Sequence, residues 1–498
     1  MIPTASPANP MPSLHQESLS SLLPRLRSGE ICPADILRDL ATAIAARDPA
    51  IGGYLNHDLD RALADAATVD TTGPLAGLPV AIKDNIHALG QSCSCGSKYF
   101  HPGYRAQYDA TVVSRLRAAG AIPFGRTNLD EFAMGSSTEN SALQTTRNPW
   151  DLLRVPGGSS GGSAAVVAAD TAIAALGSDT GGSIRQPAGF CGIVGMKPTY
   201  GRVSRYGLVA FASSLDQIGP MTKCVDDAAL LLGAIAGHDP RDSTSSSREV
   251  PNFAPGGVDS LRGMRIGLPK EYLAHGLDPA VRECILAAAR VFTDLGATVE
   301  ETSLPHTDYA VAAYYIIAPA EASSNLARFD GVRYGNRASQ PKDILDLYVR
   351  SREEGFGPEV KRRILLGTFV LSSGFYDAYY LTAQQVRAKV REDFAKAFGT
   401  YDFLIGPTAP TAAFPLGWHR ADPILHYLAD VFTIPANLAG LPALSVPCGF
   451  VGGDGCPNHL PVGLQLIGKP FGEAELLAAG KAYESATTWH LQRPPTAG

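Results

Sequence analysis

Two short loops rich in glycine and serine are the first candidates for chemistry. Residues 156–163 read Pro-Gly-Gly-Ser-Ser-Gly-Gly-Ser, and residues 177–187 read Gly-Ser-Asp-Thr-Gly-Gly-Ser-Ile-Arg-Gln-Pro. A loop of this kind before a helix serves most often as an N-cap, sometimes as a phosphate cradle, and only occasionally in catalysis. Lys83 is a third candidate and stands at the end of an apolar run, where polar residues begin. Taken alone, a lysine after a strand is usually solvated.

The segments around these loops predict alternating strands and helices. The apolar run at residues 75–83 is typical of a buried strand, and residues 121–125 predict a second strand. Between them, residues 109–120 predict a helix that Asp109 caps and Gly120 closes. Strand, helix and strand in this order favour an α/β fold, with a sheet covered by helices on both faces.

The two loops bracket one further helix and strand, expected at residues 164–169 and 172–176. A helix of about ten residues advances roughly 15 Å, and a strand of five or six residues covers a similar distance. If the strand returns along the helix, Ser159 and Ser183 finish on one rim of the sheet, within reach of Lys83. A Cα separation between the two serines well beyond about 12 Å would contradict this prediction.

Composition limits the class of protein. The 498 residues include 42 Lys plus Arg and 48 Asp plus Glu, a net charge of −6, which argues against nucleic-acid binding through a basic face. No low-complexity linker interrupts the chain, so we expect a loose segment at residues 1–17 and a single domain at 18–490. The domain begins with two helices within residues 18–46, interrupted near Pro33. Residues 451–459 predict an extended hairpin loop between strands at 443–447 and 461–467.

Location follows from the cysteines and the apolar windows. Eight cysteines lie mostly apart, without the spacing of a zinc site, and no secretory signal or membrane span is evident. A cytoplasmic protein with reduced thiols is the expectation.

Two other functional interpretations fit the loops less well. Gly157-x-Ser159-x-Gly161 matches the nucleophile elbow of an α/β-hydrolase, but no strand is predicted immediately before it, and no histidine lies in a comparably marked loop. A phosphate-binding loop would end in Lys-Ser or Lys-Thr, which this loop lacks. Nothing in the sequence indicates that this chain itself binds ATP or a metal ion.

The two loops, together with residues 195–208, resemble the amidase signature family. Residues 127–141, 321–335 and 361–369 are similar to one branch of that family, the glutamine-hydrolysing subunits of tRNA-dependent amidotransferases. The resemblance extends from about Ser18 to about Glu484. It implies the amidase signature fold, an α/β/α arrangement with a large mixed central sheet. The alternative is a stand-alone amidase of this family that acts on another amide, and a scaffold without catalysis remains a third possibility.

The resemblance assigns a Ser-Ser-Lys triad. It implies Ser183 as nucleophile, Ser159 as bridging serine after a cis Gly158–Ser159 bond, and Lys83 as base. A lysine is a poor base at pH 7 unless burial depresses its pKa, which the role requires here. Backbone N–H groups for the oxyanion are expected from Thr180, Gly181, Gly182 and Ser183.

The resemblance also implies a substrate and partners. The substrate would be glutamine, with Arg363 at its α-carboxylate, Asp430 at its α-ammonium and Tyr314 lining the pocket. Attack by Ser183 would release ammonia and leave a glutamyl ester that water hydrolyses. The ammonia would travel to the B subunit of a heterotrimer, which a small C subunit holds together. The B subunit would use ATP and Mg²⁺ and would hold most of the misacylated Glu-tRNA(Gln) or Asp-tRNA(Asn), while this chain would bind no cofactor.

Overall fold

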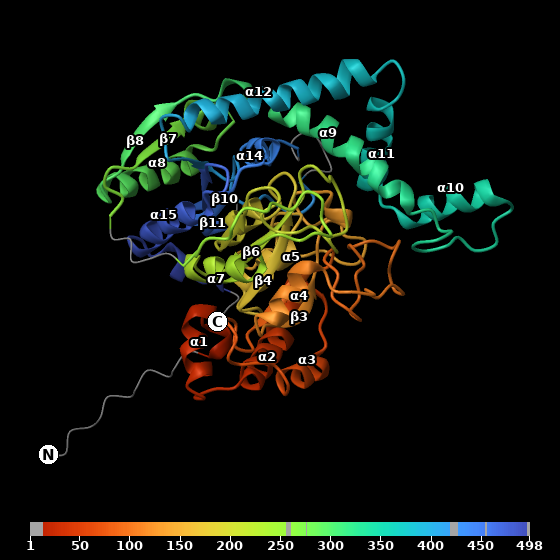
Figure 1. Ribbon diagram of the computed structural model, residues 1–498, viewed down its shortest axis with the longest axis horizontal. Helices are drawn as coiled ribbons and strands as arrows, with labels where there is room; N and C mark the ends of the chain where they lie inside the picture. Colours follow the sequence, from red (N-terminus) through yellow and green to blue (C-terminus); the bar gives the residue numbers. More distant parts are fainter. Residues whose placement is uncertain (1–12, 255–259, 275, 419–426, 454–455, 496–498) are drawn as a thin grey trace.

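The computed structural model describes residues 13–254, 260–274, 276–418, 427–453 and 456–495, with side chains except at 453 and 456–459. Within these residues, one sheet of eleven strands runs through the molecule, in the order β1-β3-β2-β4-β6-β5-β10-β11-β9-β7-β8 (Figure 1). The strands are β1 Tyr54–Asn56, β2 Pro79–Lys83, β3 Ile122–Thr127, β4 Ala174–Asp179, β5 Val194–Lys197, β6 Gln217–Thr222, β7 Arg265–Pro269, β8 Thr298–Thr302, β9 Phe403–Pro407, β10 Ala443–Gly453 and β11 Cys456–Gly468.

The sheet is mixed, as predicted. Strand β2 is parallel to β3 and β4, and β7 is parallel to β8 and β9. The remaining neighbours are antiparallel. Parallel neighbours place their carboxyl ends on the same edge, so β2 and β4 deliver Lys83 and Asp179 to one side of the sheet.

Helices cover both faces of the sheet, which confirms the predicted α/β class. Along β9, Phe403 and Ile405 pack with α8, whereas Leu404 belongs to the opposite core with α9 and α12. This alternation follows from the two-residue period of a strand. Figure 1 shows α9 and α12 together along one side of the molecule. The helices are α1 Leu19–Arg27, α2 Pro33–Ile51, α3 Leu59–Ala66, α4 Thr111–Ala118, α5 Gly161–Ala168, α6 Arg185–Cys191, α7 Val225–Ile235, α8 Pro279–Asp294, α9 Ala310–Asn325, α10 Ile344–Gly355, α11 Pro358–Val370, α12 Thr382–Ala397, α14 Ile434–Ala439 and α15 Glu473–Ser485.

Several local predictions can be compared directly with these elements. The two N-terminal helices are confirmed, and α2 begins at Pro33, where a proline is tolerated because the first N–H groups of a helix lack internal partners. The predicted cap of α4 is wrong. Asp109 lies one residue too early, because Ala110 is the N-cap, and the Asp109 carboxylate instead accepts the N–H of Leu89 and pairs with Arg117. Gly120 follows that helix with φ +83°, as a closing glycine does.

The ends of the chain and the hairpin were also predicted. Residues 1–12 of the expected loose segment lie outside the described residues. His15, which belongs to the same segment, contacts the rest of the chain: its ring lies against Asp39, and its backbone carbonyl accepts a hydrogen bond from Lys223 Nζ. Strands β10 and β11 pair as far as Gly453 and Cys456, which confirms the hairpin. The extended loop predicted at residues 451–459 is wrong in its extent, because both strands run into this range, and residues 454–455 lie outside the described part. A single domain over 18–490 stays a prediction. No helix among the described residues is long and apolar enough to cross a membrane.

Candidate active site

The two glycine and serine loops meet at the edge of the sheet where β2 and β4 end. The N–H of Ser160 donates to the carbonyl of Ser183 at 3.1 Å, so covalent geometry keeps the Cα atoms of Ser159 and Ser183 within about 8 Å. Helix α5 leads away from the first loop and β4 returns to the second. The predicted common rim is therefore confirmed. No strand precedes Ser159 directly: residues 148–154 make only isolated bridges, so a nucleophile elbow lacks its context.

Lys83 lies at the centre of this rim and is fully buried. Its Nζ is 2.8 Å from Ser159 Oγ, 2.8 Å from Ser160 Oγ and 2.9 Å from Ser178 Oγ. Burial lowers the pKa of Lys83 to about 7, even though the nearby carboxylates of Asp130, Asp179 and Asp216 act in the opposite direction. A neutral amine has a lone pair, so Nζ can accept a proton from a hydroxyl at these distances.

The first loop is held by groups that its motif does not reveal. The Gly158–Ser159 peptide bond is cis, as the family resemblance implies. A side chain at residue 158 would collide with Asp130, because a Cβ there would lie 2.1 Å from Asp130 Oδ2. The Asp130 carboxylate also accepts the N–H groups of Thr138 and Asn140 at 2.9 and 3.1 Å. The buried Asp130 therefore shapes the backbone on which Ser159 stands.

The second loop carries Ser183, whose hydroxyl has no hydrogen-bond partner among the described residues. In particular, no hydrogen bond joins it to Ser159 Oγ, so the serine-to-serine step of the relay stays a prediction. The N–H of Gly182 donates to Asp179 Oδ1 at 2.9 Å and is already engaged. The N–H groups of Thr180, Gly181 and Ser183 have no acceptor within the described part of the chain. They are therefore the predicted oxyanion donors best placed to meet a substrate.

Thr180 also anchors the loop through its side chain. Its Oγ1 donates to Asp216 Oδ1 at 2.7 Å, and the other Asp216 oxygen accepts the N–H of Phe211 at 2.9 Å. Burial raises the pKa of Asp216 to about 6. A buried carboxyl group thus holds the predicted oxyanion loop in place.

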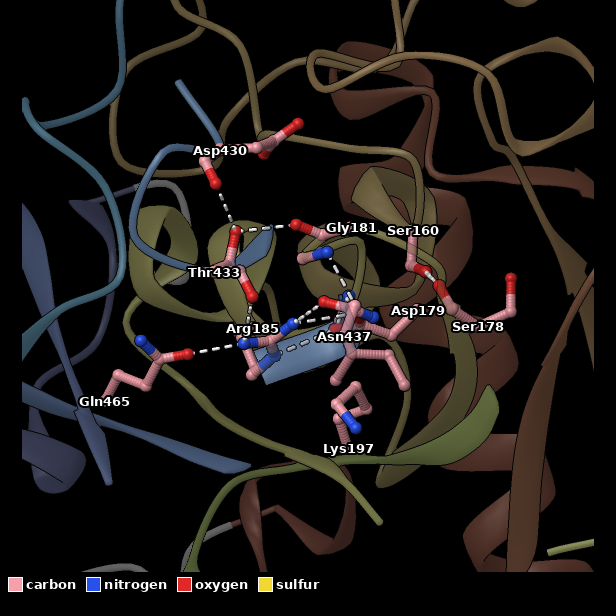
Figure 2. A network of polar contacts seen from close by, with 12 residues as sticks. Ser160, Ser178, Asp179, Gly181, Arg185, Lys197, Asp430, Thr433, Asn437 and Gln465 are labelled. Carbon is pink, nitrogen blue, oxygen red and sulfur yellow. Dashed lines mark hydrogen bonds and ion pairs between the residues drawn. The ribbon is translucent and has the colours of Figure 1, made fainter. Parts of the chain in front are cut away.

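A buried ion pair connects the second loop to a distant part of the chain (Figure 2). Arg185 Nε and Nη2 each contact one oxygen of Asp179 at 3.0 Å. Although burial would raise the pKa of Asp179, the Arg185 guanidinium lowers it to about 2. Arg185 Nη1 donates to the carbonyl of Thr433 at 3.0 Å, and Thr433 Oγ1 is 2.7 Å from the carbonyl oxygen of Gly181. Figure 2 shows Thr433 between Gly181 and Asp430, the backbone carbonyl of which is 3.1 Å from Thr433 Oγ1.

Asp430 itself is buried and only partly satisfied. Its Oδ2 accepts the Ser136 hydroxyl, whereas its Oδ1 is buried with no partner among the described residues. Burial raises the pKa of Asp430 to about 7, while Ser136 and the nearby Arg363 act to lower it. A buried carboxylate oxygen without a partner is costly, and a cationic ligand would satisfy it.

Arg363 projects from the buried side of α11 toward the same region. Its Nε donates to Glu359 Oε1 at 2.8 Å, and its Cζ lies 5.2 Å from the ring centre of Tyr315. Burial works against the charged form, but the Tyr315 hydroxyl and Glu359 outweigh it and raise the pKa of Arg363 above its ordinary value. Neither Nη atom has an acceptor among the described residues, so the outer edge of the guanidinium can bind a carboxylate in bidentate fashion.

Tyr314 completes the set of predicted ligand-binding side chains. A Cβ on Gly181 would lie 2.8 Å from both the ring Cζ and the hydroxyl oxygen of Tyr314, so this ring packs directly against the oxyanion loop. Burial raises the pKa of Tyr314, which keeps the phenol neutral. Beside α11, a cavity of ≈ 700 Å³ opens next to Glu359 and Tyr427.

The structure adds residues that the sequence prediction missed. Ser160 and Ser178 contact Lys83 as closely as Ser159 does, and Asn85 Nδ2 donates to Ser178 Oγ at 3.0 Å. Ser160 and Ser178 lie inside the two motifs, so their position was a usable signal. Nothing in the local sequence marks Asp216, which reaches the site from the residue just before β6.

Comparisons with known proteins agree with this geometry. A family model described as Amidase matches residues 35–477. The A subunit of glutamyl-tRNA(Gln) amidotransferase from Desulforudis audaxviator is 58% identical over 473 residues, 94% of this chain and 95% of that protein. The crystal structure of the A subunit of glutamyl-tRNA(Gln) amidotransferase from Thermotoga maritima matches with a TM-score of 0.80 and 44% identity, over 95% of each chain. Peptide amidase from Stenotrophomonas maltophilia matches with a TM-score of 0.78 and 32% identity, over 96% of this chain and 98% of that chain.

Proposed function

The chain belongs to the amidase signature family, and from this premise we propose that it is the glutamine-hydrolysing subunit of a tRNA-dependent amidotransferase. Relatives that match almost end to end are named as the A subunit of glutamyl-tRNA(Gln) amidotransferase. A stand-alone amidase with another substrate is the alternative, since amidases of that kind share the fold.

The proposed reaction begins with proton transfer from Ser183 through Ser159 to neutral Lys83. Ser183 Oγ attacks the carbonyl carbon of the glutamine side-chain amide, and the N–H groups of Thr180, Gly181 and Ser183 stabilise the oxyanion. The carbon–nitrogen bond then breaks as the relay returns its proton to the leaving nitrogen, which departs as ammonia. Water, deprotonated by the same relay, attacks the glutamyl ester and releases glutamate and the Ser183 hydroxyl.

One observation carries the choice of glutamine over other amides. Arg363 offers two guanidinium nitrogens without acceptors, and Asp430 offers a buried carboxylate oxygen without a partner, among the residues that the structure describes. A free amino acid carries an α-carboxylate and an α-ammonium, which are complementary to these two groups. An amide without an amino-acid head group would leave the two Arg363 Nη atoms and Asp430 Oδ1 without partners among the described residues.

Partners and cofactors follow from the same assignment. We infer that ammonia passes to a B subunit, which uses ATP and Mg²⁺ to activate Glu-tRNA(Gln) or Asp-tRNA(Asn), and that these two chains form a heterotrimer with a C subunit. The net charge of −6 fits a chain that leaves most of the tRNA contact to its partner. The seven cysteines with described side chains are all free thiols, which supports a cytoplasmic location.

An ammonia-release assay on the amidotransferase complex tests the proposal. The wild-type complex should hydrolyse glutamine, and Ser183→Ala should abolish turnover. Glutaminol, which lacks the α-carboxylate, should be a poor substrate for the wild type, and its turnover should be the same in Arg363→Ala. Equal use of glutamine and glutaminol would favour the stand-alone amidase, and full activity of Ser183→Ala would favour a scaffold.

A further inference from the structure

An apolar surface lies on the outside of α11 and on the turn and π-helix that follow it. We call it the outer apolar face, and its members are Leu365, Leu366, Phe369, Phe375, Tyr376, Tyr379 and Leu381. Each of these side chains is exposed, Leu365 to 71%. Residues 364–382 contain one charged side chain, Asp377. Such a concentration of exposed apolar groups is unusual for a surface that only water covers.

The face is continuous, because its rings touch one another. The ring centres of Phe369 and Phe375 are 4.3 Å apart, and Tyr379 lies 5.9 Å from Phe369 and 6.0 Å from Phe375. The helix α11 and the π-helix Tyr376–Leu381 therefore present one surface, although a turn separates them in sequence.

Helix α11 has a different role on each side. Its buried side carries Arg363 toward the candidate active site, and Gly367 packs so closely on α9 that a Cβ there would lie 1.9 Å from the carbonyl oxygen of Pro319. Its outer side carries Arg362, which lines the ≈ 700 Å³ cavity, and then Leu366 and Phe369 at helical spacing. The outer apolar face thus begins one helical turn beyond the cavity beside the site.

We propose that the outer apolar face docks the amidotransferase subunit that receives the ammonia, an inference that rests on the proposed function. Ammonia released into water is protonated and diluted, so its acceptor has to cover the site from which it leaves. A partner seated on this face would border the cavity that Arg362 lines, one residue along α11 from Arg363. The relatives are named as one subunit of an amidotransferase, so a docking surface for another subunit is required somewhere on such a chain.

The chemistry of the partner surface follows from the face itself. Seven exposed aliphatic and aromatic side chains, with almost no charge among them, fit an apolar and uncharged patch on the partner. Aromatic side chains in the centre of an interface usually contribute most of its binding energy. Phe369 and Phe375 are in that position here.

The test compares Leu365→Asp and Phe369→Ser/Phe375→Ser with the control Leu153→Asp. Leu153 is 73% exposed, close to the value for Leu365, but lies on a loop outside this face. Each variant is purified and titrated with the partner subunits, and its affinity for them is measured by titration calorimetry. Both face variants should bind at least about 30-fold more weakly than the wild type, whereas the control should stay within about threefold. Unchanged thermal unfolding temperatures of the isolated variants show that the chain still folds.

Two results would overturn the docking proposal. One is affinity of the face variants within about threefold of the wild type. The other is a wild-type chain that forms a dimer in light scattering and becomes monomeric in Leu365→Asp, because a second copy would then occupy the face. Failure of the proposed function is a separate result: the wild-type complex would release no ammonia from glutamine, whatever the affinities.

Discussion

The role of Lys83 makes a quantitative prediction about pH. With an ordinary lysine pKa of 10.5, about one molecule in 3,000 would carry a neutral amine at pH 7, whereas the pKa of about 7 in this site makes half of them neutral. The gain in reactive form is about three orders of magnitude. At saturating glutamine, kcat should therefore rise tenfold per pH unit below pH 6 and level off above pH 8, with its midpoint near 7.

Protein stability should report the same shift. Between pH 7 and 10.5 Lys83 is protonated in the unfolded chain but neutral in the folded chain. Burial of Lys83 therefore lowers the free energy of unfolding. This penalty is complete below about pH 7 and vanishes as the pH approaches 10.5. The full penalty is about 5 kcal/mol, and about 2 kcal/mol remains at pH 9. Lys83→Met removes it. Lys83→Met should therefore raise the free energy of unfolding relative to wild type, and this gain should be roughly 2 to 3 kcal/mol larger at pH 6 than at pH 9.

Comparison of two pH values cancels the effect of the lost serine contacts, because that effect does not depend on pH. Lys197→Met is a matched control: burial lowers the pKa of this lysine to about 7 as well, but its Nζ contacts backbone carbonyls and none of the predicted triad. The control should change stability in the same direction and leave the midpoint of kcat near 7. A kcat that keeps rising tenfold per unit to pH 9, or a Lys83→Met variant with more than about 1% of wild-type kcat, would refute the role of Lys83 as base.

Three further predictions concern the substrate groups and the frame around them. Asp430→Asn should raise KM for glutamine about 100-fold. The wild-type KM should increase as the pH falls through about 7, where Asp430 becomes protonated, and this increase should be absent in Asp430→Asn; steady-state kinetics at pH 6 and 8 measures both effects. Arg363→Lys keeps the charge but loses the bidentate geometry, so KM should rise roughly 10- to 100-fold with a smaller change in kcat, and an unchanged KM would exclude carboxylate binding. Arg185→Met leaves Asp179 buried and unpaired and should cost about 3 to 5 kcal/mol in urea unfolding, against less than about 1 kcal/mol for Arg350→Met at an exposed pair.

Much of the fold near the site followed from local signals. Apolar runs predicted β2, β3 and β4, and the lengths of α5 and β4 predicted that the two serine loops meet. The helix cap at Asp109 failed because a tertiary contact with Leu89 and Arg117 competes for the same carboxylate. No short-range pattern contains such a contact.

The residues of the candidate site also include some that sequence signals indicated and others that they did not. Ser159 and Ser183 lie in motifs with fixed spacing, and the sequence predicted that they share a rim with Lys83, but only the family resemblance assigned their roles as a triad. Arg363 and Asp430 look like ordinary surface charges in their local sequence, and only the family resemblance singled them out. Asp130 and Asp216 escaped prediction because their importance depends on full burial beside Lys83, which strand order and packing decide.

The hydrogen bonds of Thr433 have a consequence for redesign. The segment that supplies Asp430 and the loop that supplies Ser183 are about 250 positions apart, yet Thr433 and Asn437 join them through Gly181 and Asp179. A new substrate preference introduced by exchanging residues 427–440 as a cassette would disturb the loop of the proposed nucleophile Ser183 unless both of these side chains were retained. Recognition and chemistry in this enzyme are therefore not separable modules, and a graft should carry Thr433 and Asn437 as fixed positions.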